Sequence, residues 1–195
     1  MAKYLVLPLK NVIFLPSIVK PLQLTEPDHS LILNYSLSQN LPMALCYLPE
    51  GEKQFLPIAG YGMPQVVEHR DEHNYLIFIK CLGKVNILLN TINIENGCLV
   101  AEGEACYDDL SLSDRQKTKY ISLSHVLARW IQQHIHDINQ QKAFLNNLTT
   151  PTEVVSAFAT YLVYDYDLQY EIQSLAALNE KIEILYRLLE SGKLL

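Results

Sequence analysis

Long apolar runs are missing from this chain of 195 residues. No stretch approaches the ~18 consecutive apolar residues of a membrane-spanning helix, so no membrane span is expected. The segment 1–17 is apolar enough to look like a signal peptide, but Pro8, Lys10, Asn11 and Pro16 interrupt it, and no small-residue cleavage site follows. We expect a strand, a turn and a second strand there, in a protein that stays in the cytoplasm.

Cysteine is scarce and shows no motif. The four cysteines are Cys46, Cys81, Cys98 and Cys106, and no two of them form a CxxC pair. Their spacing suits neither a zinc site nor a disulfide framework. Each lies in or beside an apolar, strand-like run, where cysteine acts as a small apolar residue. They are expected to be buried free thiols in a reducing compartment.

Positive charge is in short supply as well. The chain carries 15 Lys and Arg against 21 Asp and Glu, a net charge of −6 with histidine neutral. The basic residues are scattered and form no stripe. Because non-specific nucleic-acid binding depends on Lys and Arg neutralising phosphates, this balance argues against an RNA-binding role.

The familiar motifs of catalysis are absent too. There is no G-x-S-x-G elbow, no GxxxxGK[ST] phosphate loop and no HExxH. His134 and His136 would point about 200° apart on a helix, so they cannot share one ion. His69 and His73 have ligand spacing only on a helix, and their segment is expected to be a loop. We therefore expect no metal and no cofactor.

Two carboxylates keep an enzymatic alternative open. Glu102 and Glu104 alternate with apolar residues along one expected strand, so both lie on the same face. One interpretation is that the two carboxylates form the site of an enzyme that binds a small molecule or catalyses a hydrolysis. The other, which we favour, is the solvated outer face of a sheet.

The first half of the chain has the pattern of short strands. Up to about residue 109, apolar or alternating stretches are separated by Pro, Gly and Asn. Strands are predicted at residues 4–9, 18–24, 43–48, 57–61, 65–68, 75–82, 84–89 and 99–105. The polar stretch 69–74 and Asn96-Gly97 predict hairpin turns, and Gly83 predicts a bulge or a sharp corner. This many short strands indicates a barrel or a sandwich.

One helix is predicted among these strands. Thr25 is its expected cap and Pro27 fits its first turn. Leu31, Ile32 and Tyr35 give it an apolar stripe.

From about residue 111 the apolar residues recur at helical spacing. Ser113 is expected to cap a long helix over residues 113–139. The inward face of that helix is predicted to hold Tyr120, Leu123, Leu127, Trp130, His134 and Ile138. The sequence therefore predicts two parts, a β-rich part over residues 1–110 and a small helical bundle over residues 111–195.

Further helices are predicted toward the end of the chain. Thr150-Pro151-Thr152-Glu153 combines a capping box with proline at the first helical position. The buried face of that helix is predicted to hold Val154, Val155, Phe158, Tyr161 and Leu162. Another helix follows over residues 168–178, and Asn179 is expected to cap the last one, which Gly192 ends.

Two groups of residues are candidates for recognition. Tyr164, Tyr166 and Tyr170 lie around an expected break between helices, with Asp165 and Asp167 among them. Tyrosine combines apolar contact area with a hydroxyl group and is enriched at recognition surfaces. The cluster of Tyr61, Met63 and Pro64 at a turn is the second candidate. Packing in the core is the alternative interpretation for both groups.

The order of several short motifs resembles the amino-terminal substrate-binding domain family of Lon proteases. The amino-terminal motifs are Leu7-Pro8-Leu9, Ile13-Phe14-Leu15-Pro16, Pro21-Leu22-Gln23-Leu24 and Glu26-Pro27. Later ones are Ile58-Ala59-Gly60-Tyr61, the apolar stretch 75–82 running into Gly83-Lys84-Val85-Asn86-Ile87, and the final helix 177–190. The chain departs from the family at Asn86, where arginine is usual, and at Leu24-Thr25, where Ile-Phe is usual.

What the resemblance implies is an α+β fold, a PUA-like mixed β-barrel with one inserted helix and then a helical bundle. It also implies a non-catalytic module that binds unfolded or degron-bearing polypeptide. The ATPase and protease motifs of that family's full-length members are not in this sequence. The expected partner is therefore an unfolded polypeptide or another protein, with no nucleic acid and no membrane.

Overall fold

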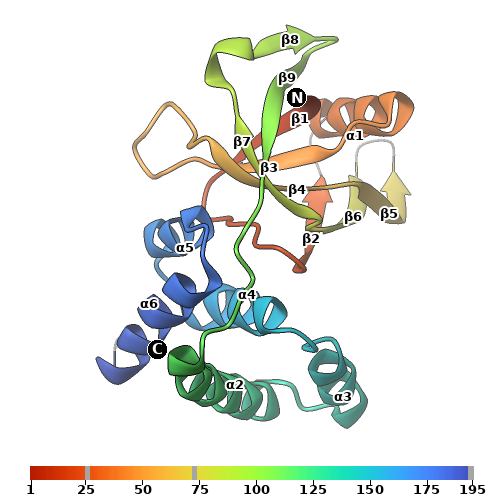
Figure 1. Cartoon of the computed structure of the whole chain (residues 1–195). Helices are drawn as coiled ribbons and strands as arrows, with labels where there is room; N and C mark the ends of the chain where they lie inside the picture. Colours follow the sequence, from red (N-terminus) through yellow and green to blue (C-terminus); the bar gives the residue numbers. More distant parts are fainter. Residues whose placement is uncertain (25–26, 72–73, 193–195) are drawn as a thin grey trace. The chain divides into compact units, whose positions relative to one another are not determined.

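The computed structural model describes residues 1–24, 27–71 and 74–192. The chain forms two compact units, Met1–Cys106 and Tyr107–Leu195. The first is rich in strands and the second is helical (Figure 1). This confirms the predicted α+β class.

A closed five-stranded barrel is the centre of the first unit. Its strands are β1 (Ala2–Leu9), β3 (Met43–Tyr47), β4 (Ile58–Gly62), β7 (Gly83–Ile87) and β9 (Cys98–Cys106). β1 runs parallel to β3 and the other neighbours are antiparallel, so the barrel is mixed, as predicted. Pairing of β9 with β1 closes it, which decides between the barrel and sandwich alternatives.

Other elements of the unit extend this barrel. A three-stranded antiparallel sheet has the order β2 (Val19–Leu24), β6 (Asn74–Lys80) and β5 (Pro64–Asp71). The helix α1 (Pro27–Gln39) is inserted between β2 and β3. The short strand β8 (Asn93–Glu95), which the sequence did not predict, pairs with β9.

Both faces of the first barrel strand are buried. Tyr4 and Val6 belong to one apolar core, whereas Leu5 and Leu7 belong to another. Because successive strand residues point to opposite faces, this double burial explains why the strand is a continuous apolar run rather than an alternating one. The same holds for β3, whose residues are all buried.

Glycine permits one close approach in the barrel. A Cβ atom on Gly60 would lie 1.8 Å from the backbone oxygen of Phe14, a distance that no side chain tolerates. Gly83 marks the predicted corner, since the chain there leaves β6 of the small sheet and enters β7 of the barrel. Asn96 and Gly97 have φ of 49° and 79°, and these positive values confirm the predicted hairpin turn.

The inserted helix confirms part of its predicted apolar stripe, since Ile32 and Tyr35 pack against one apolar core. Leu31 is 44% exposed, while Ser30, Leu33 and Ser36 are buried. The expected cap Thr25 lies outside the described residues, as do residues 72–73 of the stretch that was predicted to turn. The strands on either side of that stretch, β5 and β6, do pair.

The second unit consists of five helices among its described residues. They are α2 (Asp114–His134), α3 (Ile138–Asn146), α4 (Pro151–Leu162), α5 (Tyr166–Ser174) and α6 (Leu178–Glu190). α2 packs against both α4 and α6. Leu123, Leu127 and Ile131 form the buried stripe of α2, together with Gln116.

The prediction of one long helix over residues 113–139 is wrong, because α2 ends at His134. Ile135 is extended, and Asp137 begins α3 by accepting a hydrogen bond from the backbone N–H of Gln140 at 2.8 Å. A side chain that caps a new helix competes with continuation of the old one. His134 and Ile138 are consequently exposed rather than inward-facing.

The capping predictions had mixed outcomes. The capping box of Thr150 and Glu153 is present, with Pro151 at the first helical position. Asn179 does not cap α6, which begins after Ala177. Its side chain instead accepts from the Ser113 N–H and donates to the Ser111 oxygen, both at 3.0 Å. Tyr161 is half-buried, whereas the other four predicted residues of α4 are buried.

Candidate functional site

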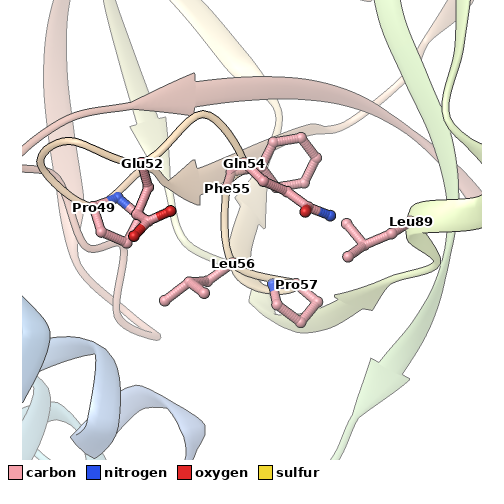
Figure 2. Close-up of a pocket in the computed structure, with 7 residues that line it drawn as sticks. All are labelled: Pro49, Glu52, Gln54, Phe55, Leu56, Pro57 and Leu89. Carbon is pink, nitrogen blue, oxygen red and sulfur yellow. The ribbon is translucent and has the colours of Figure 1, made fainter.

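An open pocket lies where the loop between β3 and β4 meets the short helix η1 (Leu89–Thr91). Its volume of about 460 Å³ falls in the range of about 300–1,000 Å³ that is usual for ligand sites. The side chains that line it are Pro49, Glu52, Gln54, Phe55, Leu56, Pro57 and Leu89 (Figure 2). All of them belong to the first unit.

Backbone hydrogen bonds hold both ends of the pocket loop. The Leu48 N–H donates to the Leu9 oxygen at 3.0 Å, and the Leu56 N–H donates to the Tyr47 oxygen at 2.8 Å. Between these anchors Gly51 turns the loop with a φ of 80°, a backbone conformation that favours glycine. The pocket is therefore framed by a loop whose two ends are tied to barrel strands.

The lining is apolar with a polar edge. Phe55 is only 8% exposed and is part of the barrel core that also holds Ala59 and Val85. Glu52 and Gln54 are exposed, so the polar groups lie on the solvent side. This arrangement suits an apolar group that also carries a hydrogen-bond donor.

A second, smaller hollow of about 180 Å³ is polar. It is lined by Lys3, Thr91, Asn93, Glu95, Ala101 and Glu102. The Lys3 ammonium donates to both carboxylate oxygens of Glu95 at 2.6 Å, and the Tyr35 hydroxyl donates to the same carboxylate at 2.8 Å. These hydrogen bonds, that of Lys3 first, lower the pKa of Glu95. Such a carboxylate stays ionised and is poorly suited to act as a general acid.

One carboxylate of the enzymatic alternative, Glu102, lines this hollow. Glu102 and Glu104 lie on one face of β9, as predicted, and both are exposed. Glu102 is paired in register with Lys3, and Glu104 with Asn86. The pair is therefore on a solvated face, in agreement with the favoured interpretation.

The barrel candidates Tyr61, Met63 and Pro64 lie at the junction of β4 and β5. Pro64 is buried, while Tyr61 and Met63 are half-buried. The ring of Tyr61 packs edge-on against Tyr4 with ring centres 5.2 Å apart. Much of this cluster thus contributes to barrel packing, and its role in recognition stays a prediction.

The tyrosine candidates of the second unit are more accessible. Tyr164 is 67% exposed and Tyr166 36%, whereas Tyr170 is half-buried in α5. The helix break predicted here exists, because α4 ends at Leu162 and Asp165 caps α5 by accepting from the Leu168 N–H at 3.1 Å. The two groups of candidates lie in different units.

Comparison with known families identifies the chain. The family model described as the ATP-dependent protease La (LON) substrate-binding domain matches residues 3–191. The chain belongs to this family. The match covers both units, so the whole described structure is one such domain.

Solved structures agree on the fold of this Lon substrate-binding domain. The N-terminal domain of Lon protease from Mycobacterium avium complex matches with a TM-score of 0.70 and 15% identity, covering 94% of this chain and 96% of that one. The Lon N-terminal domain protein from Xanthomonas campestris matches with a TM-score of 0.67 and 12% identity, covering 95% and 97%. No curated protein matches the chain in sequence.

Among the other sequence-based candidates, His134 packs against a neighbouring aromatic ring. His134 stacks on Trp130 with ring centres 4.5 Å apart, and its Nδ1 lies 2.9 Å from the Trp130 oxygen. Within residues 1–24, 27–71 and 74–192, no three His, Cys, Asp or Glu side chains gather into a possible metal site. In the same residues, no helix has the length and apolar character to span a membrane.

The pocket residues are the functional candidates that sequence reasoning missed. Phe55 and Leu89 are far apart in the chain and come together because β4 and β7, the strands beside them, pair with each other. A signal was present in the loop, where Pro49, Phe55, Leu56 and Pro57 place apolar groups beside Glu50, Glu52 and Lys53. Loops usually run over the surface, so a loop with several apolar residues indicates either packing or a binding site.

Proposed function

We propose that this chain is a non-catalytic recognition module that binds unfolded or degron-bearing polypeptide. The observation that carries the proposal is the family match over residues 3–191, since the family is described as the substrate-binding domain of an ATP-dependent protease. The two solved relatives are likewise N-terminal domains of Lon proteins.

The pocket of the first unit supports this proposal physically. Unfolded chains expose apolar side chains, and the pocket offers an apolar lining open to solvent. Tyr164, Tyr166 and Tyr170 of the helical unit are a second proposed contact. Tyr61, Met63 and Pro64 of the barrel are a third, separate one. We place the domain in the cytoplasm, in keeping with four cysteines that are all free.

The direct test is binding of an unfolded model protein without ATP. Reduced, carboxymethylated α-lactalbumin with a fluorescent label is titrated with the full chain, and its anisotropy is measured. We expect saturable binding, with the labelled folded form of α-lactalbumin as the unbound control. Absence of binding at high micromolar concentration would contradict the proposal.

Single substitutions then locate the binding surface. Leu56→Gln places an amide in the pocket, while Ile94→Gln changes an exposed apolar residue outside it. Partial burial of one leucine is worth about 1 kcal/mol, so Leu56→Gln should weaken binding about five-fold and Ile94→Gln should not. Equal effects of the two changes would argue against the pocket.

The tyrosine contact has its own pair of variants. Tyr164→Ala removes an exposed candidate, and Tyr107→Ala removes a tyrosine of the same unit that is 88% exposed. We expect weaker binding of the unfolded protein for Tyr164→Ala alone. The same affinity for both variants would remove Tyr164 from the binding surface.

A further inference from the structure

Glu52 is an unusual carboxylate in this structure. It lies on the edge of an apolar pocket, and among the seven side chains that line the pocket it is the only charged one. Within the described residues it forms no ion pair, whereas Glu95, Glu183, Asp108 and Asp114 are each paired with a lysine. Its negative charge is thus available to a ligand.

The pocket combines this charge with apolar walls. Figure 2 shows Leu56 and Pro57 between Glu52 on one side and Leu89 on the other. A ligand group that fills the pocket therefore contacts aliphatic carbon atoms inside it and the Glu52 carboxylate at its edge. Gln54 adds an amide oxygen that can accept a further hydrogen bond.

Lysine and arginine side chains have the matching chemistry. Each has an apolar stem that packs on aliphatic surface and a cationic head that stays near water. Glu52 is exposed, so the head is paired without being stripped of solvent. The net charge of −6 also raises the local concentration of cationic segments around the domain.

We propose that the pocket of Glu52, Leu56, Pro57 and Leu89 binds a lysine or arginine side chain of an unfolded client, with the stem on the apolar walls and the head at Glu52. This inference rests on the proposed polypeptide-binding function and names the residue type that the pocket selects. Clients rich in basic residues next to apolar ones are then preferred over acidic ones.

The test compares two labelled peptides of the same unfolded sequence. One carries an arginine between two leucines, and the other carries citrulline in its place, which keeps the shape and removes the charge. The affinity of the full chain for each peptide is measured by fluorescence anisotropy. Because an exposed ion pair contributes little, we expect the arginine peptide to bind about two- to five-fold more tightly, with the ratio falling as salt is added.

Variants connect the preference to Glu52. Glu52→Gln should bring the ratio of the two affinities close to one and leave the affinity for the citrulline peptide unchanged. Glu104→Gln, a matched change of an exposed carboxylate on β9 of the same unit, should keep the wild-type ratio. Leu56→Gln should weaken both peptides by the same factor.

The outcomes separate this inference from the proposed function. A ratio of one in the wild type, or a ratio that Glu52→Gln leaves unchanged, overturns the basic pocket while unfolded α-lactalbumin still binds. Failure of both peptides and of unfolded α-lactalbumin overturns the two proposals together. The basic pocket is supported if Glu52→Gln abolishes the preference for the arginine peptide and Glu104→Gln does not.

Discussion

The ammonium of Lys181 is paired with the carboxylate of Asp108, and only 6% and 9% of the two side chains remain exposed. Beside this pair, the Asp109 N–H donates to the Ala176 oxygen at 2.7 Å, and the Leu178 N–H donates to the Asp109 oxygen at 2.9 Å. The first residues of the helical unit are therefore fastened to the start of α6.

Loss of the Lys181 charge should destabilise the helical unit strongly. In Lys181→Met the Asp108 carboxylate stays buried but loses the Lys181 ammonium, and removing one partner of such a pair costs about 3–5 kcal/mol. Urea unfolding followed by circular dichroism measures the change. Lys117→Met, which breaks the exposed pair with Asp114, is the control and should cost less than about 1 kcal/mol.

The stability contributed by Glu183 should disappear in acid. Its carboxylate accepts hydrogen bonds from Gln116 at 2.9 Å, from Lys119, and from Arg187 at 3.0 Å, and these contacts lower its pKa from 4.5 to about 2. A carboxyl whose pKa is lowered by folding stabilises the folded state above pH 4.5, and this contribution is lost as the pH falls toward 2.

Thermal unfolding of Glu183→Gln across that pH range tests this expectation. The variant should melt below the wild type near neutral pH, and the difference in Tm should shrink as the pH falls from 4.5 to 2. A difference that stays constant over the range would contradict the assigned role. Glu180→Gln, at an exposed position of the same helix, controls for the loss of one negative charge.

The capping box of α4 should be worth about 1 kcal/mol. The Thr150 hydroxyl accepts from the Glu153 N–H at 3.3 Å, and Glu153 Oε2 accepts from the Thr150 N–H at 2.8 Å. Thr150→Ala removes the first bond, a change that costs about 0.5–2 kcal/mol at helix N-caps. Thr152→Ala lies two residues into the same helix and serves as the control in urea unfolding, where no comparable loss is expected.

Thiol reactivity should distinguish one cysteine from the other three. Burial raises the pKa of the Cys46 and Cys81 thiols to about 12 and also raises that of Cys98. Cys106 is only partly buried. With a thiol-specific colour reagent at neutral pH, one group should react quickly in the folded protein, and Cys106→Ser should abolish that phase. Fast reaction of more than one thiol would contradict this burial pattern.

Local chemistry is the part of the fold that the sequence predicts best. Thr150 to Glu153 and Asn96-Gly97 form the predicted capping box and turn because each depends on neighbours within four residues. Competition between local signals explains the errors. The spacing of apolar residues predicted that α2 continues past Ile138, but the side chain of Asp137 caps a new helix there.

Long-range contacts explain the rest. Leu31 of α1, predicted to be buried from its spacing, is exposed, and Leu33 is buried instead, because the surrounding barrel and sheet decide which side of the helix is covered. The pocket was not predicted for the same reason. Phe55 and Leu89 become neighbours only after β3, β4 and β7 have paired.

Pairing between the first and last barrel strands has a consequence for biosynthesis. Ala2 lies opposite Gly103 and Tyr4 opposite Ala101, so one edge of β1 has no strand partner until β9 has been made. During translation the barrel cannot close until β9 has left the ribosome, about a hundred residues after β1. Until then one edge of this apolar strand stays unpaired. Such sequence-distant pairing predicts slow folding, and an open strand edge leaves the unfinished barrel prone to aggregation until β9 pairs with β1.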